Sequence, residues 1–496
     1  MIIRKECAMK KRILHHTAAV AALCMTLNCS GLSVFADGDM PESKVYQGLR
    51  YFVSEEGDSV IISGYTDNLP AELVIPAEID GLPVSDIGQF AFGNCDKLVS
   101  VTIPETVTAL GFQNFYSCTN LKEVHLPDTL ISLYEAAFVG CTALTSITLP
   151  EGLTTLGNLV FCDCTALKEI NFPSTLNTFG EPAFANTPWL ADQLEKGPYV
   201  IINHIVVDGT TVMDEAVLPP DAKGVASYAF MENTSIKSLV LPEGLTSIGL
   251  ASFSGCSNLA EITFPKSLTE IGMNAFDSTA WLASQADLVI VNDILISGAK
   301  AKGNVTVPEG VRVIGGGAFS GNADLTGIQL PATLEKIEKW SFYDCSSLKE
   351  VTVPSGVKSI GNDAFYHAEA LENLTIRSPF CEIEGWGETV SNGTNTETWT
   401  VFYNGTITGY DGSLAQKYAM EYGYRFISLG KFELIAGDCN SDGALTVSDA
   451  VILAKIIGEV LPADQVPDGE VLTAADLDQD QLLTVLDIRL LLKNIA

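Results

Sequence analysis

A repeat of 23 residues constrains this 496-residue chain more than any other feature of its sequence. Phenylalanine recurs within one motif, and the first five intervals are 23, 23, 23, 23 and 46 residues. Because a fixed period of about 20–50 residues is typical of stacked repeats, we predict a solenoid of short parallel strands, one set for each 23-residue coil. The recurring positions are Phe92, Phe115, Phe138, Phe161, Phe184, Phe230, Phe253, Phe276, Phe319, Phe342 and Phe365.

The sequence of one coil predicts which of its residues form the core. A short strand is expected to end at Pro127, because proline has no N–H to give to a strand ladder. One coil cannot bury its apolar face alone, whereas stacked coils share a continuous core. The side chains expected to point inward are Leu121, Val124, Leu126, Leu130, Leu133, Ala137, Phe138, Cys141 and Leu144.

Two interruptions of the repeat, near 187–210 and 279–298, resemble each other in sequence. Each begins with a Thr-x-Trp-Leu-Ala segment and continues with two apolar runs on either side of an asparagine, Asn203 or Asn292. Apolar runs about a turn residue favour a β-hairpin within an expanded repeat. Whether these insertions contact a ligand or are decorations without a function is open.

One residue of each strand is expected on the open face of the solenoid, because side chains alternate along a strand. This row is rich in threonine and uncharged, and it lacks the aromatic and arginine side chains that dominate protein-binding hot spots. Threonine also suits a strand surface for its own sake, so the row names no ligand. Its members are Thr102, His125, Thr148, Asn171, Val240, Thr263, Thr306, Gln329, Thr352 and Thr375.

Most cysteines after residue 36 follow the same repeat. Cys95, Cys118, Cys141 and Cys164 lie 23 residues apart, and Cys256 and Cys345 occupy the same motif position. This spacing favours a column of small buried residues. Neighbouring coils at about 5 Å would also permit disulfides between adjacent members, so free thiols and disulfides are both open.

Composition and the N-terminal segment bear on compartment and partners. With 28 Lys and Arg against 61 Asp and Glu, the net charge of −33 argues against a nucleic-acid partner, which requires a basic surface. Residues 1–36 have basic residues 10–12, an apolar run and a small residue at the end, as in a signal peptide. Since no other apolar run is long enough, we expect a secreted, extracellular protein without a transmembrane anchor.

Two acidic loops near the C-terminus have the spacing of oxygen ligands around Ca²⁺. Oxygen-bearing side chains stand at positions 1, 3, 5, 9 and 12 of each loop, and position 7 offers its backbone carbonyl. Gln481 replaces the usual glycine in the second loop, so the second of the two calcium sites is expected to be the weaker. The expected ligands are Asp438, Asn440, Asp442, Ala444, Thr446 and Asp449, then Asp476, Asp478, Asp480, Leu482, Thr484 and Asp487.

Catalytic motifs do not emerge from the sequence. His125, His204 and His367 lie in different repeats and without metal-ligand spacing. Cys162 and Cys164 flank Asp163, but no neighbouring histidine in the sequence would activate either thiol. We therefore expect no enzyme, although carboxylate pairs for glycoside hydrolysis are too easily found in an acidic chain to be dismissed by counting.

Two resemblances extend these inferences. The pattern Leu-x-x-Ile-x-Leu-Pro-x-x-Leu-x-x-Ile-Gly-x-x-Ala-Phe-x-x-Cys over residues 70–378 resembles the BspA-like leucine-rich repeat family. That resemblance implies a right-handed solenoid that binds proteins or surfaces, with 37–69 as an N-terminal cap region and 379–430 as a closing segment. The duplicated loop–helix unit in 431–496 resembles the dockerin module of cellulosomal proteins, a small all-α calcium-binding domain.

The dockerin resemblance implies a partner, the cohesin module of a scaffoldin, and localisation at the cell surface or in a cellulosome. The family's cohesin contacts map to Val447, Ser448, Lys455, Val485, Leu486 and Lys493. The two loops differ at these positions, which favours a single binding orientation.

Three functions follow as hypotheses. The first is a non-catalytic protein whose dockerin docks on a scaffoldin while the solenoid binds a protein, a cell surface or a polysaccharide. The second is a polysaccharide-degrading cellulosomal component, and the third is a free secreted adhesin.

Overall fold

The computed structural model describes residues 43–180, 182–385, 387–395, 398, 400–432, 437, 447–457, 475, 477, 488 and 490–493. The expected signal peptide, residues 1–36, lies outside this part of the chain. The chain divides into two compact units, Met1–Leu153 with Phe161–Pro173 and Thr154–Val160 with Ser174–Ala496. Each unit is a β-solenoid, and each is described by itself below.

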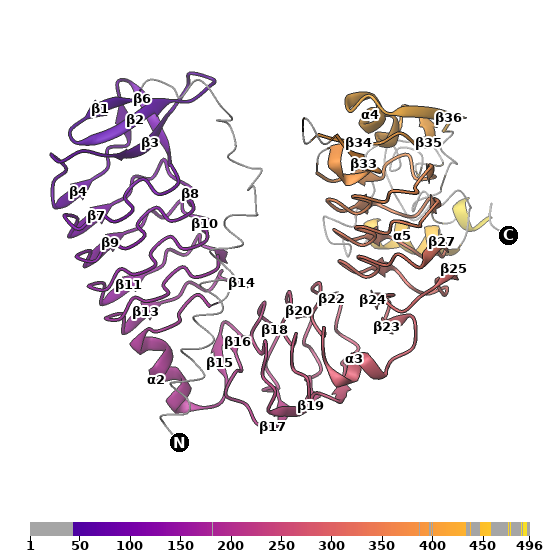
Figure 1. Ribbon diagram of the computed structural model, residues 1–496, viewed down its shortest axis with the longest axis horizontal. Coiled ribbons are helices and arrows are strands. Elements are labelled where there is room, and N and C mark those ends of the chain that lie inside the picture. Colours follow the sequence, from indigo (N-terminus) through magenta and orange to yellow (C-terminus); the bar gives the residue numbers. More distant parts are fainter. Residues whose placement is uncertain are drawn as a thin grey trace. The chain divides into compact units, whose positions relative to one another are not determined.

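The first unit opens with a sheet of antiparallel and parallel strands, in the order β1-β2-β3-β6-β5, that covers the first coil of its solenoid (Figure 1). Its strands are β1 (Lys44–Tyr46), β2 (Leu49–Val53), β3 (Val60–Tyr65), β5 (Glu78–Ile79) and β6 (Leu82–Ile87). The coils that follow carry two parallel ladders. The longer strands are β4 (Glu72–Val74), β7 (Ser100–Thr102), β9 (Glu123–His125), β11 (Ser146–Thr148) and β13 (Glu169–Asn171), and the two-residue strands are β8 (Ala109–Leu110) and β10 (Ser132–Leu133).

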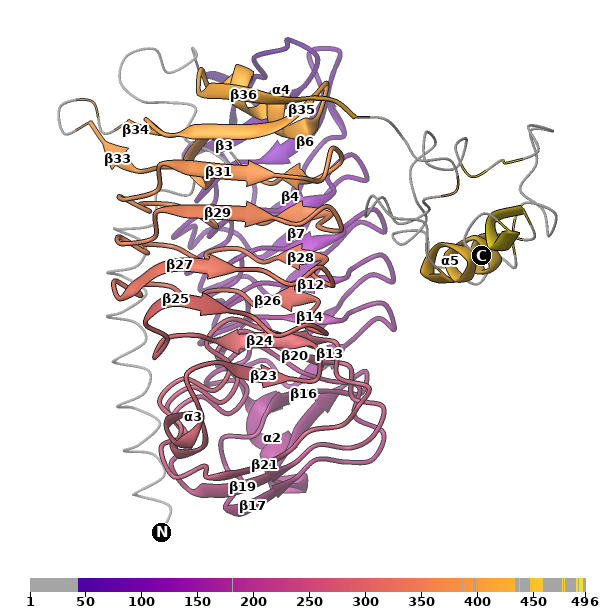
Figure 2. The same ribbon diagram turned by 90° about the vertical axis from the view of Figure 1, so that its right-hand side faces the viewer.

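The second unit repeats this plan with more coils, and Figure 2 shows β25, β27, β29 and β31 lying parallel in successive coils. Its longer strands are β17 (Asp214–Val217), β19 (Ile236–Val240), β21 (Glu261–Thr263), β25 (Gly303–Thr306), β27 (Leu325–Gln329), β29 (Glu350–Val353) and β31 (Asn373–Ile376). Its two-residue strands are β12 (Thr155–Leu156), β14 (Thr178–Phe179), β18 (Gly224–Val225), β20 (Ser247–Ile248), β22 (Glu270–Ile271), β26 (Val313–Ile314), β28 (Lys336–Ile337), β30 (Ser359–Ile360) and β32 (Glu382–Ile383).

The repeated phenylalanines form stacks along the core of each unit. In the first unit Phe92, Phe115 and Phe138 are fully buried, and their ring centroids are 5.2 and 5.3 Å apart with nearly parallel planes. The second unit contains two such stacks, which include Phe230–Phe253 at 4.8 Å and Phe319–Phe342 at 5.2 Å. Offset stacks at this separation contribute about 0.5–1.5 kcal/mol per pair beyond the burial of apolar area.

Most of the predicted core of one coil is confirmed. Seven of the nine residues are completely buried, whereas Val124 and Leu126 are partly exposed on β9 and just after it. The strand ends two residues before Pro127, as expected. The Pro127 carbonyl then accepts a hydrogen bond of 3.2 Å from the Leu130 N–H, which closes a turn.

Backbone hydrogen bonds join the phenylalanine segments of successive coils. In the coils of Phe92, Phe115, Phe230, Phe253, Phe319 and Phe342 the phenylalanine N–H, and the N–H groups of the residues two before and two after it, donate to carbonyls of the next coil. For Phe115 these three bonds run from Gln113, Phe115 and Ser117, with lengths of 3.1, 2.9 and 2.7 Å. Gln113 and Ser117 have φ values of 57° and 55°, a region that costs a residue with a side chain about 1–2 kcal/mol.

Each insertion contains a helix that the sequence analysis did not foresee, followed by an antiparallel hairpin. Thr187 and Thr279 are the N-cap residues, and each hydroxyl accepts from a backbone N–H three residues on at 3.1 Å. Trp189 and Trp281 then pack against the last phenylalanine of the preceding coil. The ring centroids are 4.7 Å apart for Trp189 and Phe184 and 5.2 Å apart for Trp281 and Phe276. The elements are α2 (Pro188–Lys196), β15 (Val200–Ile202) and β16 (Ile205–Asp208), then α3 (Ala280–Ser284), β23 (Val289–Val291) and β24 (Ile294–Ser297).

The last coil of the second unit is closed by a further helix and sheet. Ala415 and Tyr418 from this helix belong to the same buried cluster as Phe365 of the last regular coil. The closing elements are η1 (Gly387–Thr389), β33 (Gly393–Thr394), β34 (Val401–Phe402), β35 (Thr406–Asp411), α4 (Leu414–Glu421) and β36 (Arg425–Lys431). They protect the apolar end of the stack from water, which terminal repeats must do.

We expect Phe138→Ala to lower the free energy of unfolding by about 3–5 kcal/mol, because it leaves a cavity in a packed core and removes two stacked contacts. Tyr134→Ala in the same coil is the matched control, since Tyr134 is 45% exposed. We expect a loss of less than about 1 kcal/mol there. Urea unfolding followed by circular dichroism measures both, and equal losses would contradict the stack as the main source of stability.

Candidate binding surfaces and calcium module

The predicted open-face row lies along the longer strands, and none of its ten residues is buried. The parallel register places Thr102 beside His125, Thr148 beside Asn171 and Thr352 beside Thr375. Side chains bridge coils along the row, with the Asn171 amide donating to Thr148 at 3.1 Å and Thr306 donating to Gln329 at 3.0 Å. The row is therefore an accessible polar stripe.

A second exposed row lies two residues earlier on the same strands, and the sequence analysis missed it. It includes Glu123, Glu169, Glu261 and Glu350, all of which are exposed. The sequence could have predicted this second row, because residues two apart share a face of a strand. These four glutamates, here called the acidic row, lie beside the threonine row, and the equivalent position of the other strands that carry the threonine row is Ser, Asn or Gly.

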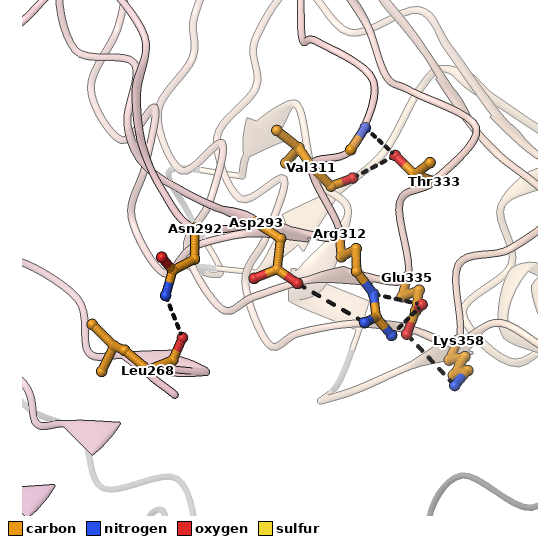
Figure 3. Close-up of polar contacts among 9 residues, drawn as sticks. Leu268, Asn292, Asp293, Val311, Arg312, Thr333, Glu335 and Lys358 are labelled. Atoms are coloured by element: carbon orange, nitrogen blue, oxygen red, sulfur yellow. Dashed lines mark hydrogen bonds and ion pairs between the residues drawn. The ribbon is translucent and has the colours of Figure 1, made fainter. Parts of the chain in front are cut away.

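A ladder of charged residues crosses successive coils of the second unit at the short strands (Figure 3). The Arg312 guanidinium lies 3.9 Å from Asp293 Oδ2 and 2.6 Å from Glu335 Oε1. Lys358 Nζ lies 3.7 Å from Glu335 Oε2. The Arg312 side chain is 53% exposed, and such pairs contribute about 0–1 kcal/mol each. This ladder links coils and leaves no unpaired charge for a ligand.

The hairpin turn in each insertion is fastened to the preceding coil by its asparagine. The Asn292 amide donates to the Leu268 carbonyl at 2.9 Å (Figure 3), and the Asn203 amide donates to Leu176 at the same distance. Both asparagines have positive φ, which asparagine tolerates better than most residues.

All eight cysteines in the described part of the chain are buried free thiols, so the alternative of disulfides between adjacent coils is wrong there. In five coils the thiol donates to the carbonyl of the phenylalanine in the preceding coil, as Cys118 does to Phe92 at 3.1 Å. Burial raises the pKa of the Cys162 thiol to about 12, which keeps it protonated at neutral pH and unsuited to nucleophilic attack.

The three histidines do not form a site together. His204 Nδ1 lies 3.1 Å from Asp221, His125 lies 3.9 Å from Glu123, and His367 Nε2 lies 2.8 Å from the Thr394 hydroxyl. Among the residues that the structure describes, no three His, Cys, Asp or Glu side chains gather as a metal site. None of the described helices is long and apolar enough to cross a membrane.

In the C-terminal module the structure describes mainly helical residues. Helix α5 (Val447–Ile457) carries Asp449 in its first turn, and this side chain is completely buried. Leu453 of α5 packs with Ala475 and Leu491, so the two halves of the module share a small core. A buried carboxylate at the start of a helix, directly after the acidic segment 438–446, has the oxygen chemistry that Ca²⁺ requires.

The remaining predicted site residues are located as follows. The side chain of Lys493 is exposed. Val447, Ser448 and Lys455 lie on α5, and their side chains are outside the described structure. Also outside it are Asp438, Asn440, Asp442, Ala444, Thr446, Asp476, Asp478, Asp480, Leu482, Thr484, Val485, Leu486 and Asp487.

Stacked coils with a repeated Phe and Cys motif, followed by a small helical module, define a leucine-rich-repeat protein with an appended domain. The model of the BspA type leucine rich repeat region matches residues 85–194, 210–288 and 290–396 in six copies. The chain belongs to this family, and the model of the dockerin type I domain matches residues 436–496. No curated protein matches the chain.

Several solved structures are also similar to this chain. One from Bacteroides ovatus is 22% identical with a TM-score of 0.31, and the match covers 78% of this chain and 99% of that one. A leucine-rich repeat protein of T. pallidum is 25% identical with a TM-score of 0.27, and the match covers 47% and 90%. The pneumococcal vaccine antigen PcpA is 16% identical with a TM-score of 0.29, and the match covers 79% and 99%. At these TM-scores the matches carry no argument about function.

Stability should fall as the pH rises above about 9. Burial raises the pKa of the Cys118, Cys345 and Cys381 thiols from 9.0 to about 12. Between these values the unfolded chain loses thiol protons that the folded chain keeps, so alkali favours unfolding. Urea unfolding at a series of pH values between about 8 and about 10 measures the slope.

Cys345→Ala is the control for this slope, because it removes one of the titrating thiols. We expect the variant to lose less stability than the parent protein over the same pH interval. A stability that stays constant between about pH 8 and about pH 10, where an unfolded thiol ionises, would contradict buried protonated thiols.

Proposed function

We propose that this protein is a secreted, non-catalytic binding protein held on a cellulosome-type scaffold. Its dockerin docks on a cohesin module in a calcium-dependent way, and its solenoid presents a binding face. The proposal is supported above all by the combination of the repeat family with a dockerin type I domain in one chain. We propose the division 1–36 signal peptide, 37–69 cap, 70–378 solenoid with its two insertions, 379–430 closing segment and 431–496 dockerin.

The calcium part of the proposal rests on the two acidic loops and on Asp449. The first ion would be held by the loop from Asp438 to Asp449, and the second by the loop from Asp476 to Asp487. Calcium supplies a positive centre that draws the loop oxygens together and so fixes the start of each helix. The burial of Asp449 in the first turn of α5, the helix that carries Leu453 of the small core, supports its role as a ligand.

We propose that cohesin contacts α5 and the helix that contains residues 490–493. The contact residues would be Val447, Ser448 and Lys455 in the first half and Val485, Leu486 and Lys493 in the second. The exposed position of Lys493 supports this assignment. Val447-Ser448 and Val485-Leu486 differ, so a cohesin is expected to bind in one orientation.

The open face of the solenoid is the proposed binding surface for a further partner. Its threonine row and its acidic row are both accessible, and they run along successive strands. A protein, a cell surface or a polysaccharide are the partners considered for it.

Calorimetry of residues 37–496 against a panel of cohesins, in calcium and in EDTA, tests the docking. We expect binding in calcium and none in EDTA, because the loops need the ion to order the cohesin-binding helices. We expect Asp438→Ala to weaken calcium binding by about tenfold or more, since it removes a charged ligand.

Asp58→Ala is the matched control, because Asp58 is an exposed carboxylate of the first unit. It should leave both calcium and cohesin binding unchanged. Calcium uptake without binding to any cohesin would contradict the scaffold and leave a free secreted adhesin as the function.

A further inference from the structure

The second insertion interrupts the hydrogen bonding between coils and leaves donors without acceptors. In the coil before it, Ala251, Phe253 and Gly255 donate their N–H groups to the carbonyls of Met273, Ala275 and Asp277, at 2.9, 2.8 and 2.8 Å. The equivalent donors of the next coil are Asn274, Phe276 and Ser278. In the part of the chain that the structure describes, none of these three N–H groups donates a hydrogen bond.

The opposite side of the interruption offers acceptors. In the coil where the repeat resumes, the carbonyls equivalent to those of Met273, Ala275 and Asp277 belong to Gly316, Ala318 and Ser320. Gly298, just after β24, reaches only the central one, Ala318, at 2.7 Å. Gly298 is held against Phe319 so closely that a Cβ atom would lie 2.0 Å from the ring, so this loop cannot move deeper to fill the space. Within the described chain the Gly316 and Ser320 carbonyls accept no hydrogen bond.

A cavity of about 240 Å³ lies beside these groups, and Asn274, Phe276 and Ser320 line it, whereas Ser278 and Gly316 lie outside its lining. Its lining includes Asn274, Phe276 and Asp277 on one side, Ala299 in the turn after β24, and Gly317 and Ser320 on the other. Asp277 forms no ion pair with any described residue, and partial desolvation raises the pKa of its carboxyl. The cavity thus combines N–H donors, carbonyl acceptors and one carboxylate.

The first insertion does not offer the same arrangement, although its sequence is similar. Pro182 occupies the position of Asn274 there and has no N–H, and Ala185 occupies the position of Asp277. The donor row with an adjacent carboxylate is therefore particular to the second insertion.

We propose that this cavity binds an extended peptide segment of a partner protein, by β-augmentation of the interrupted coil stack. The peptide carbonyls would accept from Asn274, Phe276 and Ser278, its N–H groups would donate to Gly316 and Ser320, and a basic side chain would pair with Asp277. The regular coils of this same molecule provide the template, because there a peptide backbone with carbonyls at alternate residues satisfies each such row.

This inference deepens the proposed function, on which it rests for the solenoid as the partner-binding part, but it does not require calcium. Hydrogen exchange at residue resolution on residues 37–496 in EDTA therefore tests it separately from cohesin docking. In the free protein, the amides of Asn274, Phe276 and Ser278 should exchange about tenfold faster or more than those of Ala251, Phe253 and Gly255. Equal protection of the two rows would overturn the proposal.

The probe is the peptide acetyl-Ser-Val-Lys-Val-Ser-amide at about 10 mM, a concentration that would fill most of a site with a Kd of about 1 mM. We expect the peptide to slow exchange of the three amides about fivefold or more. The analogue with norleucine in place of lysine lacks the cation that would pair with Asp277, so it should slow exchange less in the parent protein. In the Asp277→Asn variant the two peptides should slow exchange equally. Unchanged exchange with the peptide, or slowing by cellotetraose instead, would overturn the proposal.

Two tryptophan variants control for the place of binding. Ala299→Trp fills the cavity from the turn after β24 and should abolish the effect of the peptide. Ala323→Trp places the same side chain at an exposed alanine outside the cavity lining and should leave the effect intact. Equal responses of the two variants would show that the peptide binds elsewhere and overturn the assignment.

Discussion

Everything in this structure depends on contact between successive coils, because a single 23-residue coil cannot bury its own apolar face. The stacked phenylalanines, the thiol column and the backbone bonds between coils all act across that contact. Phe115 shows the dependence in one residue, since its ring stacks on both neighbours and its N–H donates to the next coil. Within the second unit, α4 continues the buried cluster of the last coil, which gives that end of the stack a cover.

Because the coils are so regular, groups that could bind a partner are expected where the repeat is interrupted. In six of the regular coils all three donors around the phenylalanine are satisfied by the next coil. At the second insertion α3 and the β23–β24 hairpin replace a regular coil, Trp281 ends the phenylalanine stack, and the donors of Asn274 and Phe276 are left facing a cavity. The C-terminal module has a small core of its own, and its proposed ligands are carboxylates rather than backbone groups.

Much of the solenoid could be predicted from the sequence, since the period fixes which side chains face inward. The buried phenylalanines and cysteines follow from it, and the hairpin turns at Asn203 and Asn292 follow from the apolar runs on either side of each asparagine. Helices α2 and α3 were missed because they are short, although Thr187 and Thr279 are recognisable N-caps. Positive φ at residues such as Gln113 could not be predicted, because no local preference of glutamine favours it and only the hydrogen bonds between coils impose it. Most of the calcium ligands lie outside the described residues and remain predictions.

We propose that the chain has two separate binding parts. A calcium-dependent module anchors the chain to cohesin, and cohesin does not contact the solenoid. Hydrogen exchange of residues 37–496, with and without a bound cohesin in calcium, tests this claim most directly. We expect slower exchange in residues 447–457 and 488–493 and unchanged exchange throughout residues 70–378. Protection of the solenoid strands by cohesin, with none in the C-terminal module, would contradict it.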